Sequence, residues 1–301
     1  MKNLRRKRFR LLSGFSRKSL SEIIVYSLVS LIFLAFAFSY VYILFFVAVN
    51  GLKSHNEAVM HPWGLPQEYH FSNYTSLFTQ LVVYEGTSYE ANFLKMLFNS
   101  LYFSIIGSLL NMMFTAMAAY VTCKYKFKGS GIFYPLALLI MTIPIYGSGG
   151  ALYKLYFRLG MINSYGQIFL SWGGFNLQYL YFYAAFSNLS TAYAEAASID
   201  GAGDYTIYFR IMFPQVFNVF GALFILAWVA DWNNYSSVLV YLPKIPTLAG
   251  GIYLFQAETQ ATVRQHILYA AYFLVSVPPL LLFAFFNKTF TTNISLGGVK
   301  E

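Results

Sequence analysis

The sequence carries little charge and a single cysteine. Only 10% of its 301 residues are Asp, Glu, Lys or Arg, against about one quarter in typical soluble chains. The lone cysteine, Cys123, can form neither an internal disulfide nor a cysteine zinc cluster. Because 58% of the residues are apolar and 20% are aromatic, the chain lacks the polar groups needed to cover a surface that faces water. These numbers exclude most soluble enzymes and predict an all-α, polytopic membrane protein.

Motifs that would power or catalyse a reaction are also missing. The stretch 147–150 lacks the lysine of a phosphate-binding loop, and 201–203 lacks the third glycine of a dinucleotide fingerprint. The sequence contains no Ser-His-Asp set, H-E-x-x-H motif or paired intramembrane carboxylates, so a membrane-embedded hydrolase has no support. His55, His61 and His70 do not have the spacing of a zinc site. We therefore expect no enzyme activity, no metal site and no cofactor.

Six apolar runs are candidates for membrane-spanning helices. They cover residues 23–49, 97–121, 132–146, 175–189, 216–241 and 267–286. The first run is about 40 Å long at 1.5 Å per residue, which predicts tilt or an extension beyond the lipid. The third and fourth runs are short for a bilayer and contain or adjoin proline or glycine. Six spans would place both termini on the same side of the membrane.

Charge predicts which side that is. A basic arm, residues 1–22, holds eight Lys and Arg in its first 18 positions. Such an arm can bind nucleic acid, but this one runs directly into an apolar stretch that is too long for a cleaved signal peptide. The positive-inside rule therefore places the arm in the cytoplasm and gives no reason to expect a nucleic-acid partner. With six spans, the inner segments hold 14 of the 20 basic residues, which predicts that both termini are cytoplasmic. The spans themselves would lie in the cell membrane, in contact with lipid.

The rest of the chain, residues 23–301, is expected to form one transmembrane domain. Its first outer segment, 51–95, is long and rich in aromatic residues. We expect a small extracytoplasmic subdomain there that meets a soluble partner.

The segment 190–214, between the fourth and fifth runs, does not resemble a passive connector. Residues 194–197 favour helix and present small side chains that let another surface approach closely. Asp200-Gly201 is a strong helix breaker, since glycine supplies a positive φ where a helix ends. Pro214 suits the first turn of the transmembrane helix that follows. The segment thus predicts a short helix, a sharp turn and a second helix.

This segment resembles the EAA signature of ABC-importer permeases, E-A-A-x3-G-x9-I-x-L-P. The matching residues, in register, are Glu195, Ala196, Ala197, Gly201, Ile211 and Pro214, while Phe213 replaces the usual Leu. Asp200 and Ala202 complete the extended form that is typical of the carbohydrate-uptake branch, of which the maltose permeases are the familiar case. Further similarity to that family is carried by Asn99-Ser100, Pro144, the stretch 232–235 and the C-terminal stretch 296–300.

The resemblance implies the type I ABC importer permease fold and a set of partners. These are a second homologous permease, a dimer of ATPase subunits and an extracytoplasmic solute-binding protein. The residues of the EAA signature would form a coupling helix that docks on the ATPase, where Glu195 can pair with a basic group. ATP would be hydrolysed on that partner, so this chain would be a non-catalytic subunit that forms half of the pathway for a carbohydrate.

The fifth run carries groups suited to sugars, which are bound by aromatic faces and by hydrogen bonds to hydroxyls. The expected pathway residues are Trp228, Asp231, Trp232, Asn233, Asn234 and Tyr235. The alternative is that they join neighbouring helices. By resemblance to the maltose permeases, the loop with Gly250, Gly251 and Tyr253 would contact the binding protein, and its glycine pair would be flexible.

Two other functions stay open on the sequence. Asp231 is the one acid within the six runs, and a carboxylate at membrane depth can serve an ion-coupled secondary transporter. An importer of the same family could also carry a solute that is not a sugar, such as an amino acid, a polyamine or a phosphonate.

Overall fold

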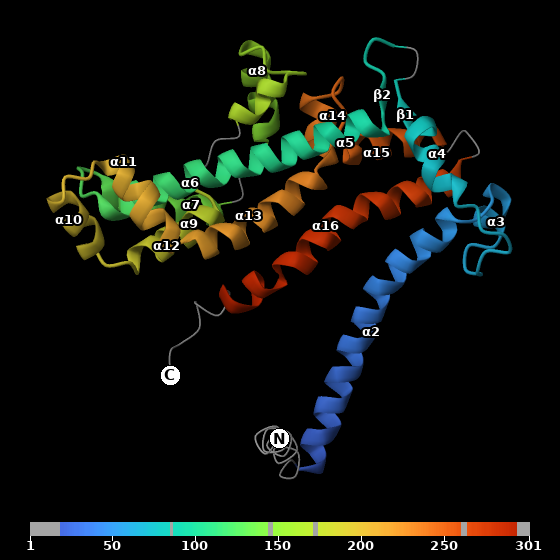
Figure 1. Cartoon of the computed structure of the whole chain (residues 1–301), viewed down its shortest axis with the longest axis horizontal. Helices are drawn as coiled ribbons and strands as arrows, with labels where there is room; N and C mark the ends of the chain where they lie inside the picture. Colours follow the sequence, from blue (N-terminus) through green and yellow to red (C-terminus); the bar gives the residue numbers. More distant parts are fainter. Residues whose placement is uncertain (1–18, 85–86, 144–146, 171–173, 260–263, 294–301) are drawn as a thin grey trace.

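The computed structural model describes residues 19–84, 87–143, 147–170, 174–259 and 264–293, and most of them are helical (Figure 1). The α-helices are α2 (Leu20–Gly51), α3 (His55–Met60), α4 (Ser72–Gln80), α5 (Phe93–Leu101), α6 (Gly107–Lys124), α7 (Phe133–Thr142), α8 (Ser148–Arg158), α9 (Leu177–Ser187), α10 (Ala192–Ile199), α11 (Asp204–Thr206), α12 (Phe213–Gln215), α13 (Phe217–Trp232), α14 (Tyr235–Tyr241), α15 (Leu248–Thr259) and α16 (Gln265–Asn293). Two π-helical segments, η2 (Tyr102–Ile106) and η5 (Ile207–Met212), and two 3₁₀ segments, η3 (Ser130–Ile132) and η4 (Tyr165–Leu170), complete the helical part.

Three helices in the described ranges are long and apolar enough to cross a membrane. They are Leu20–Gly51, the continuous helix Phe93–Lys124 and Gln265–Phe286; a fourth results if the bent pair Asp204–Gln215 and Phe217–Trp232 counts as one span. α7 and α9 have 10 and 11 residues, so each is about 15 Å long and reaches only half of a 30 Å hydrocarbon core. The chain is an all-α, multi-pass membrane protein, and the count of six spans stays a prediction.

The first helix, α2, starts earlier than the apolar run because a capping box forms at its N-terminus. Ser19 Oγ accepts from the backbone N–H of Glu22, and the Glu22 carboxylate accepts from the N–H of Ser19. Residues 20–41 are exposed on every side of the helix. Figure 1 shows α2 contacting the start of α16 at one end and diverging from the other helices toward its N-terminus.

The second span combines α5, η2 and α6 and anchors the neighbouring segment 242–248. Asn99, fully buried in α5, donates from Nδ2 to the carbonyl oxygen of Pro246 at 2.8 Å. The hydroxyl of Ser100 accepts from the backbone N–H of Leu248 at 2.7 Å. These buried bonds explain the two polar residues within an apolar run, because buried polar groups require partners.

The predicted fifth span, 216–241, is wrong as one continuous helix. α13 ends at Trp232, and α14 begins at Tyr235 because Asn234 caps it, with Oδ1 accepting from the N–H of Ser237 at 3.1 Å. The start also differs from the prediction. Pro214 lies in α12, ahead of a 78° bend, and α13 begins three residues later.

The outer segment 51–95 folds as α3, α4 and a two-stranded antiparallel ribbon of β1 (Val82–Val83) and β2 (Ala91–Asn92). Its apolar residues pack with α15 and α16 in one core cluster that includes Leu77, Met96, Trp228 and Ile252. A second cluster, around Met112, Tyr179, Phe182 and Met212, joins α6, α9 and η5. The chain therefore has one packed region at each end of the helix Phe93–Lys124 (Figure 1).

Candidate functional site

The turn after α10 has the geometry that the sequence predicts. Gly201 has φ +83°, in the left-handed region. The N–H of Ala202 donates to the carbonyl of Ala197 at 2.9 Å, and that of Gly201 donates to Ser198 at 3.1 Å. This pair of bonds is the Schellman motif, which closes the end of a helix with glycine at the left-handed position. The prediction of a helix that ends at a left-handed Gly201 is confirmed.

The α10 helix presents one face outward. Glu195, Ala196 and Asp200 are exposed, and Ile199 is 86% exposed, a high value for an apolar side chain. Ala197, by contrast, is 8% exposed and packs into the core cluster of α6 and α9. The exposed apolar face of Ile199 is a feature that the sequence interpretation missed, although an isoleucine beside Asp200 in a loop was a visible signal.

The second half of the segment is a short helix that leads into α13. Ala202 and Ile211 are half-buried and Pro214 is exposed. α11, η5 and α12 follow one another without a break from Asp204 to Gln215. The eight residues of the EAA signature thus occupy a helix, a tight turn and a second helix at one end of the molecule (Figure 1).

Three side chains fasten this turn to the end of α6. The hydroxyl of Tyr125 donates to Asp204 Oδ1 at 2.8 Å, and Lys124 Nζ donates to the carbonyl of Leu189 at 2.6 Å. Burial, together with the neighbouring Asp204 carboxylate, raises the pKa of Tyr125, so its hydroxyl stays protonated as a donor. The ring of Tyr120 packs between Tyr125 and Tyr208, with centroids 5.8 and 5.0 Å away. The turn is therefore tied to the span Phe93–Lys124.

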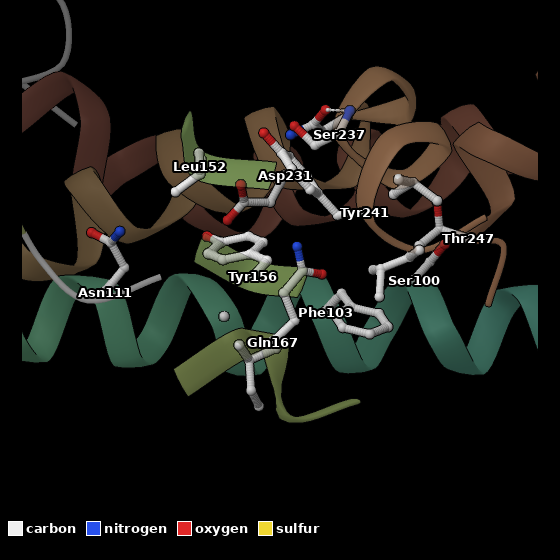
Figure 2. A pocket seen from close by; sticks show the side chains of 15 residues that line it. Ser100, Phe103, Asn111, Leu152, Tyr156, Gln167, Asp231, Ser237, Tyr241 and Thr247 are labelled. Atoms are coloured by element: carbon white, nitrogen blue, oxygen red, sulfur yellow. Dashed lines mark hydrogen bonds between the residues drawn. The ribbon is translucent and has the colours of Figure 1, made fainter. Parts of the chain in front are cut away.

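A cavity of about 290 Å³ lies between that span and α13–α14. Figure 2 shows the helix with Ser100, Phe103 and Asn111 along one side and Asp231 directed into the space from the other. Its walls come from α5, η2, α6, α8, η4, α13 and α14, and from the segment 242–247. The lining residues are Ser100, Phe103, Gly107, Asn111, Leu152, Tyr156, Gln167, Ile168, Asp231, Asn234, Ser237, Val238, Tyr241, Leu242 and Thr247.

Asp231 contributes a carboxylate to this cavity. Its side chain is exposed, and Oδ2 accepts a hydrogen bond from the buried Ser108 at 2.5 Å. Asp231 thus has both a hydrogen-bond partner and a polar cavity, as a carboxylate at membrane depth requires.

The predicted pathway residues divide into two groups. Asp231 and Asn234 line the cavity. Trp228 and Trp232 do not line it: they are 3% and 2% exposed, pack in the core cluster with α16, and Trp232 Nε1 donates to the carbonyl of Val275. The run is apolar around its whole circumference, so its sequence does not show which face turns toward the core. The two tryptophans therefore do not form the wall of this cavity, and their place in the solute pathway stays a prediction.

Asn233 and Tyr235 also lie outside the lining. Asn233 Nδ2 donates back to the carbonyl of Val229 at 2.8 Å, and the exposed ring of Tyr235 stacks on Tyr253 with centroids 4.9 Å apart. Tyr253, which is 47% exposed, remains the accessible member of the expected binding-protein contact.

The expectation of a flexible glycine pair is wrong. Gly250 and Gly251 are buried inside α15. A Cβ at Gly250 would lie 2.9 Å from Val238, and one at Gly251 would overlap Met96. The glycines allow α15 to pack closely against α14 and α5, which is a structural use of small residues.

Several lining residues were not predicted. Tyr156 comes from α8 and Gln167 from η4, two elements within an outer segment in which no helix was expected. Asn111, Ser237 and Tyr241 come from predicted runs. An asparagine inside the apolar run 97–121 was the clearest signal, since an amide at membrane depth requires a polar environment.

The chain is similar in sequence to permease subunits of bacterial transport systems. The family model described as "binding-protein-dependent transport system inner membrane component" matches residues 111–295, more than half of the chain. The arabinooligosaccharides transport system permease protein AraQ of Bacillus subtilis is 28% identical over 274 residues, covering 90% of this chain and 94% of its own. The diacetylchitobiose uptake system permease protein NgcG of Streptomyces coelicolor is 27% identical, with 83% and 81% covered.

A solved structure has the same fold. It is a bacterial ABC transporter involved in the import of the acidic polysaccharide alginate, which superposes with a TM-score of 0.70 and covers 90% of this chain and 98% of its own. The sequence identity is 19%, so the likeness concerns the fold alone. It identifies the architecture as the type I permease fold.

Proposed function

The chain belongs to the family of binding-protein-dependent transport system inner membrane components, and from this we propose that it is the permease subunit of an ATP-driven importer for carbohydrate, specifically an oligosaccharide. Several relatives are named for such cargo: arabinooligosaccharides, diacetylchitobiose, and melibiose, raffinose and stachyose. The hydrogen-bonding groups of the cavity lining and its aromatic side chains suit the same class of solute.

The observation that carries the proposal is the segment with the EAA signature. It lies inside the residues that match the family, and it folds as an exposed helix closed by the left-handed Gly201. We assign α10 as the coupling helix that docks on a separate ATPase subunit. Glu195 and Ile199 would supply a charged and an apolar contact, and Ala196 would let the partner approach.

The segment can pass motion to the cavity through rigid elements. Closure of two ATPase subunits around ATP would move α10, and the helix Asp204–Gln215 would move with it. The bond between Tyr125 and Asp204 extends the motion to α6, while the bend at Val216 extends it to α13, which carries Asp231. Such rigid-body movement would switch the pathway between inward-facing and outward-facing states.

The exposed faces of the chain suit the other partners. The apolar surface of α2 is exposed over residues 20–41 and diverges from α16, so a second, homologous permease can pack there, with lipid covering the rest. The outer segment 51–95 and Tyr253 would meet an extracytoplasmic solute-binding protein. Both termini are cytoplasmic in this proposal, and ATP is hydrolysed on the partner subunits; the C-terminal stretch 296–300 lies outside the described residues.

The two alternative functions, an ion-coupled secondary transporter and an importer of a non-sugar solute, would use different residues and substrates. A secondary transporter would use Asp231 as its ion site, and the described residues give that carboxylate one hydrogen bond and no charged partner. A non-sugar importer would use the same α10 segment with another cargo. Transport assays separate all three.

Reconstituted uptake tests the proposal. Proteoliposomes that contain this chain, its second permease and the ATPase pair should accumulate a labelled oligosaccharide only when ATP and the binding protein are both supplied. A proton or sodium gradient should not replace ATP. Concentrative uptake by this chain alone, driven by an ion gradient, would contradict the proposal. ATP-driven uptake of amino acids but not of sugars would support the role as a permease subunit and contradict the assignment of carbohydrate as its substrate.

Removing the hydroxyl of Tyr125 should loosen the coupling. This exposed hydrogen bond contributes about 1 kcal/mol, and without it Tyr125→Phe should let the α10 turn move more freely relative to α6. We expect more ATP hydrolysed per sugar imported, measured in the same proteoliposomes. Asp204→Asn keeps an acceptor for Tyr125 and should stay closer to the wild-type ratio. An unchanged ratio in Tyr125→Phe would mean that this bond does not transmit the motion.

A further inference from the structure

The cavity has one charged side chain in its lining. That residue is Asp231, and no lysine, arginine or histidine is among the lining residues that the structure describes. The other polar lining groups are neutral: the amides of Asn111, Asn234 and Gln167, and several hydroxyls. Among the described residues, the lining therefore carries one negative charge and no positive charge to offset it.

The carboxylate is oriented but not neutralised. Ser108 donates to Oδ2 at 2.5 Å, which fixes one oxygen without adding a charge. No ion pair to Asp231 occurs within the described ranges. Figure 2 shows the carboxylate directed into the space between the two walls, where a solute would meet it. Oδ1 remains available as a hydrogen-bond acceptor.

This arrangement acts differently on neutral and on acidic sugars. The hydroxyls of a neutral sugar can donate to a carboxylate, and such charge-assisted bonds are stronger than those between neutral groups. The carboxylate of a uronic acid would instead lie within a few ångströms of Asp231 in a cavity of about 290 Å³. Like charges at that separation repel several times more strongly at a protein's effective dielectric constant than in bulk water.

We propose that Asp231 is a specificity-determining residue that admits uncharged oligosaccharides to this cavity and excludes acidic ones. The inference rests on the proposed function and narrows its substrate class. It also separates this chain from the alginate importer whose fold it shares, because that protein's described cargo is an acidic polysaccharide. The two chains share one architecture, and in this chain Asp231 would be the residue that disfavours an acidic cargo.

The test measures the cavity without the binding protein, which would otherwise select the solute first. The purified complex of this chain with its second permease and the ATPase pair is titrated in detergent at pH 7. The probes are three neutral trisaccharides (maltotriose, raffinose and arabinotriose) and one acidic trisaccharide, trigalacturonate. We expect at least one neutral probe to bind about a hundredfold more tightly than trigalacturonate.

Two substitutions isolate the charge. Asp231→Asn keeps the shape and a hydrogen-bonding group, and should reduce the hundredfold preference to roughly tenfold or less, mainly through tighter trigalacturonate binding. Asn234→Asp keeps the acceptor that caps α14 and adds a second carboxylate to the lining, so it should widen the preference. The unfolding temperature of each variant is compared with that of the wild type, to show that the fold is intact.

The inference is overturned if trigalacturonate binds the wild type as tightly as the neutral probes, if Asp231→Asn leaves the ratio unchanged, or if no probe binds. The same preparation is reconstituted with the binding protein and assayed for ATP-driven sugar uptake. If ATP-driven sugar uptake occurs but neutral and acidic trisaccharides bind equally well, only this inference is overturned. If no ATP-driven sugar uptake occurs, the proposed function itself is overturned.

Discussion

Gly201→Val is expected to lower sugar uptake roughly thirtyfold while the protein still inserts in the membrane. The φ of +83° at this position is unfavourable for any side chain and most unfavourable for a β-branched one. The penalty of about 2 kcal/mol lowers the ratio of formed to unformed turns about thirtyfold, which sets the expected size of the loss. A Cβ at Gly201 meets nothing within 4 Å, so the effect would come from the backbone and not from a clash. Uptake in proteoliposomes measures the loss.

Matched variants distinguish the turn from general damage. Gly203 lies two residues further on, has φ −74°, and also has no atom within 4 Å of a Cβ. Gly203→Val should therefore keep most of the uptake. Gly201→Asn should recover a large part of the activity, since asparagine tolerates the left-handed region. Equal uptake in Gly201→Val and Gly203→Val would show that the conformation of this turn does not matter for transport.

Gly51→Leu should destabilise the whole protein. A Cβ at Gly51 would lie 2.9 Å from Cα of Ala270 and 2.8 Å from Oη of Tyr74, and the first of these is backbone that cannot rotate away. A side chain here must push α2 off α16. Overpacking of this kind costs about 3 kcal/mol, and we expect the thermal unfolding temperature in detergent to fall by roughly 5 °C or more.

Gly64→Leu is the control for that experiment. Gly64 lies in the same outer segment, and the nearest atom to its Cβ is the carbonyl oxygen of His61 at 3.9 Å. The same leucine should be tolerated there. If the two variants unfold at the same temperature, the close crossing of α2 and α16 at Gly51 does not contribute to stability.

The features that could be predicted from the sequence are those fixed by local chemistry. Asp200-Gly201 specifies its own turn, because glycine is the residue that enters the left-handed region without strain. Long apolar runs specify membrane helices for an equally local reason. A carboxylate within an apolar run cannot face hydrocarbon without a large cost, so a polar setting for Asp231 is a consequence of the sequence alone.

The features that could not be predicted depend on packing between distant segments. The orientation of Trp228 and Trp232 toward α16 is set by the rotation of α13, which an apolar sequence does not encode. Glycine pairs suggest flexibility until a neighbour such as Met96 is known to fill the space beside them. The start of α14 was a different kind of miss: Asn234 caps it through the N–H of Ser237, only three residues along, and an asparagine is a typical N-cap residue that the sequence interpretation overlooked.

The helix Asp204–Gln215 and α13 meet at 78°, so together they have the geometry of a bent lever with two arms. The pivot is Val216, which is 2% exposed and therefore held on all sides. Measured from Val216 at 1.5 Å per residue, the first arm is about 18 Å long to Asp204 and the second is about 22 Å long to Asp231. If the two helices turn together, as the proposed coupling requires, an axial displacement of the first helix becomes a sideways displacement at Asp231. Because the second arm is longer by about a quarter, the displacement at the cavity would slightly exceed that at the α10 end.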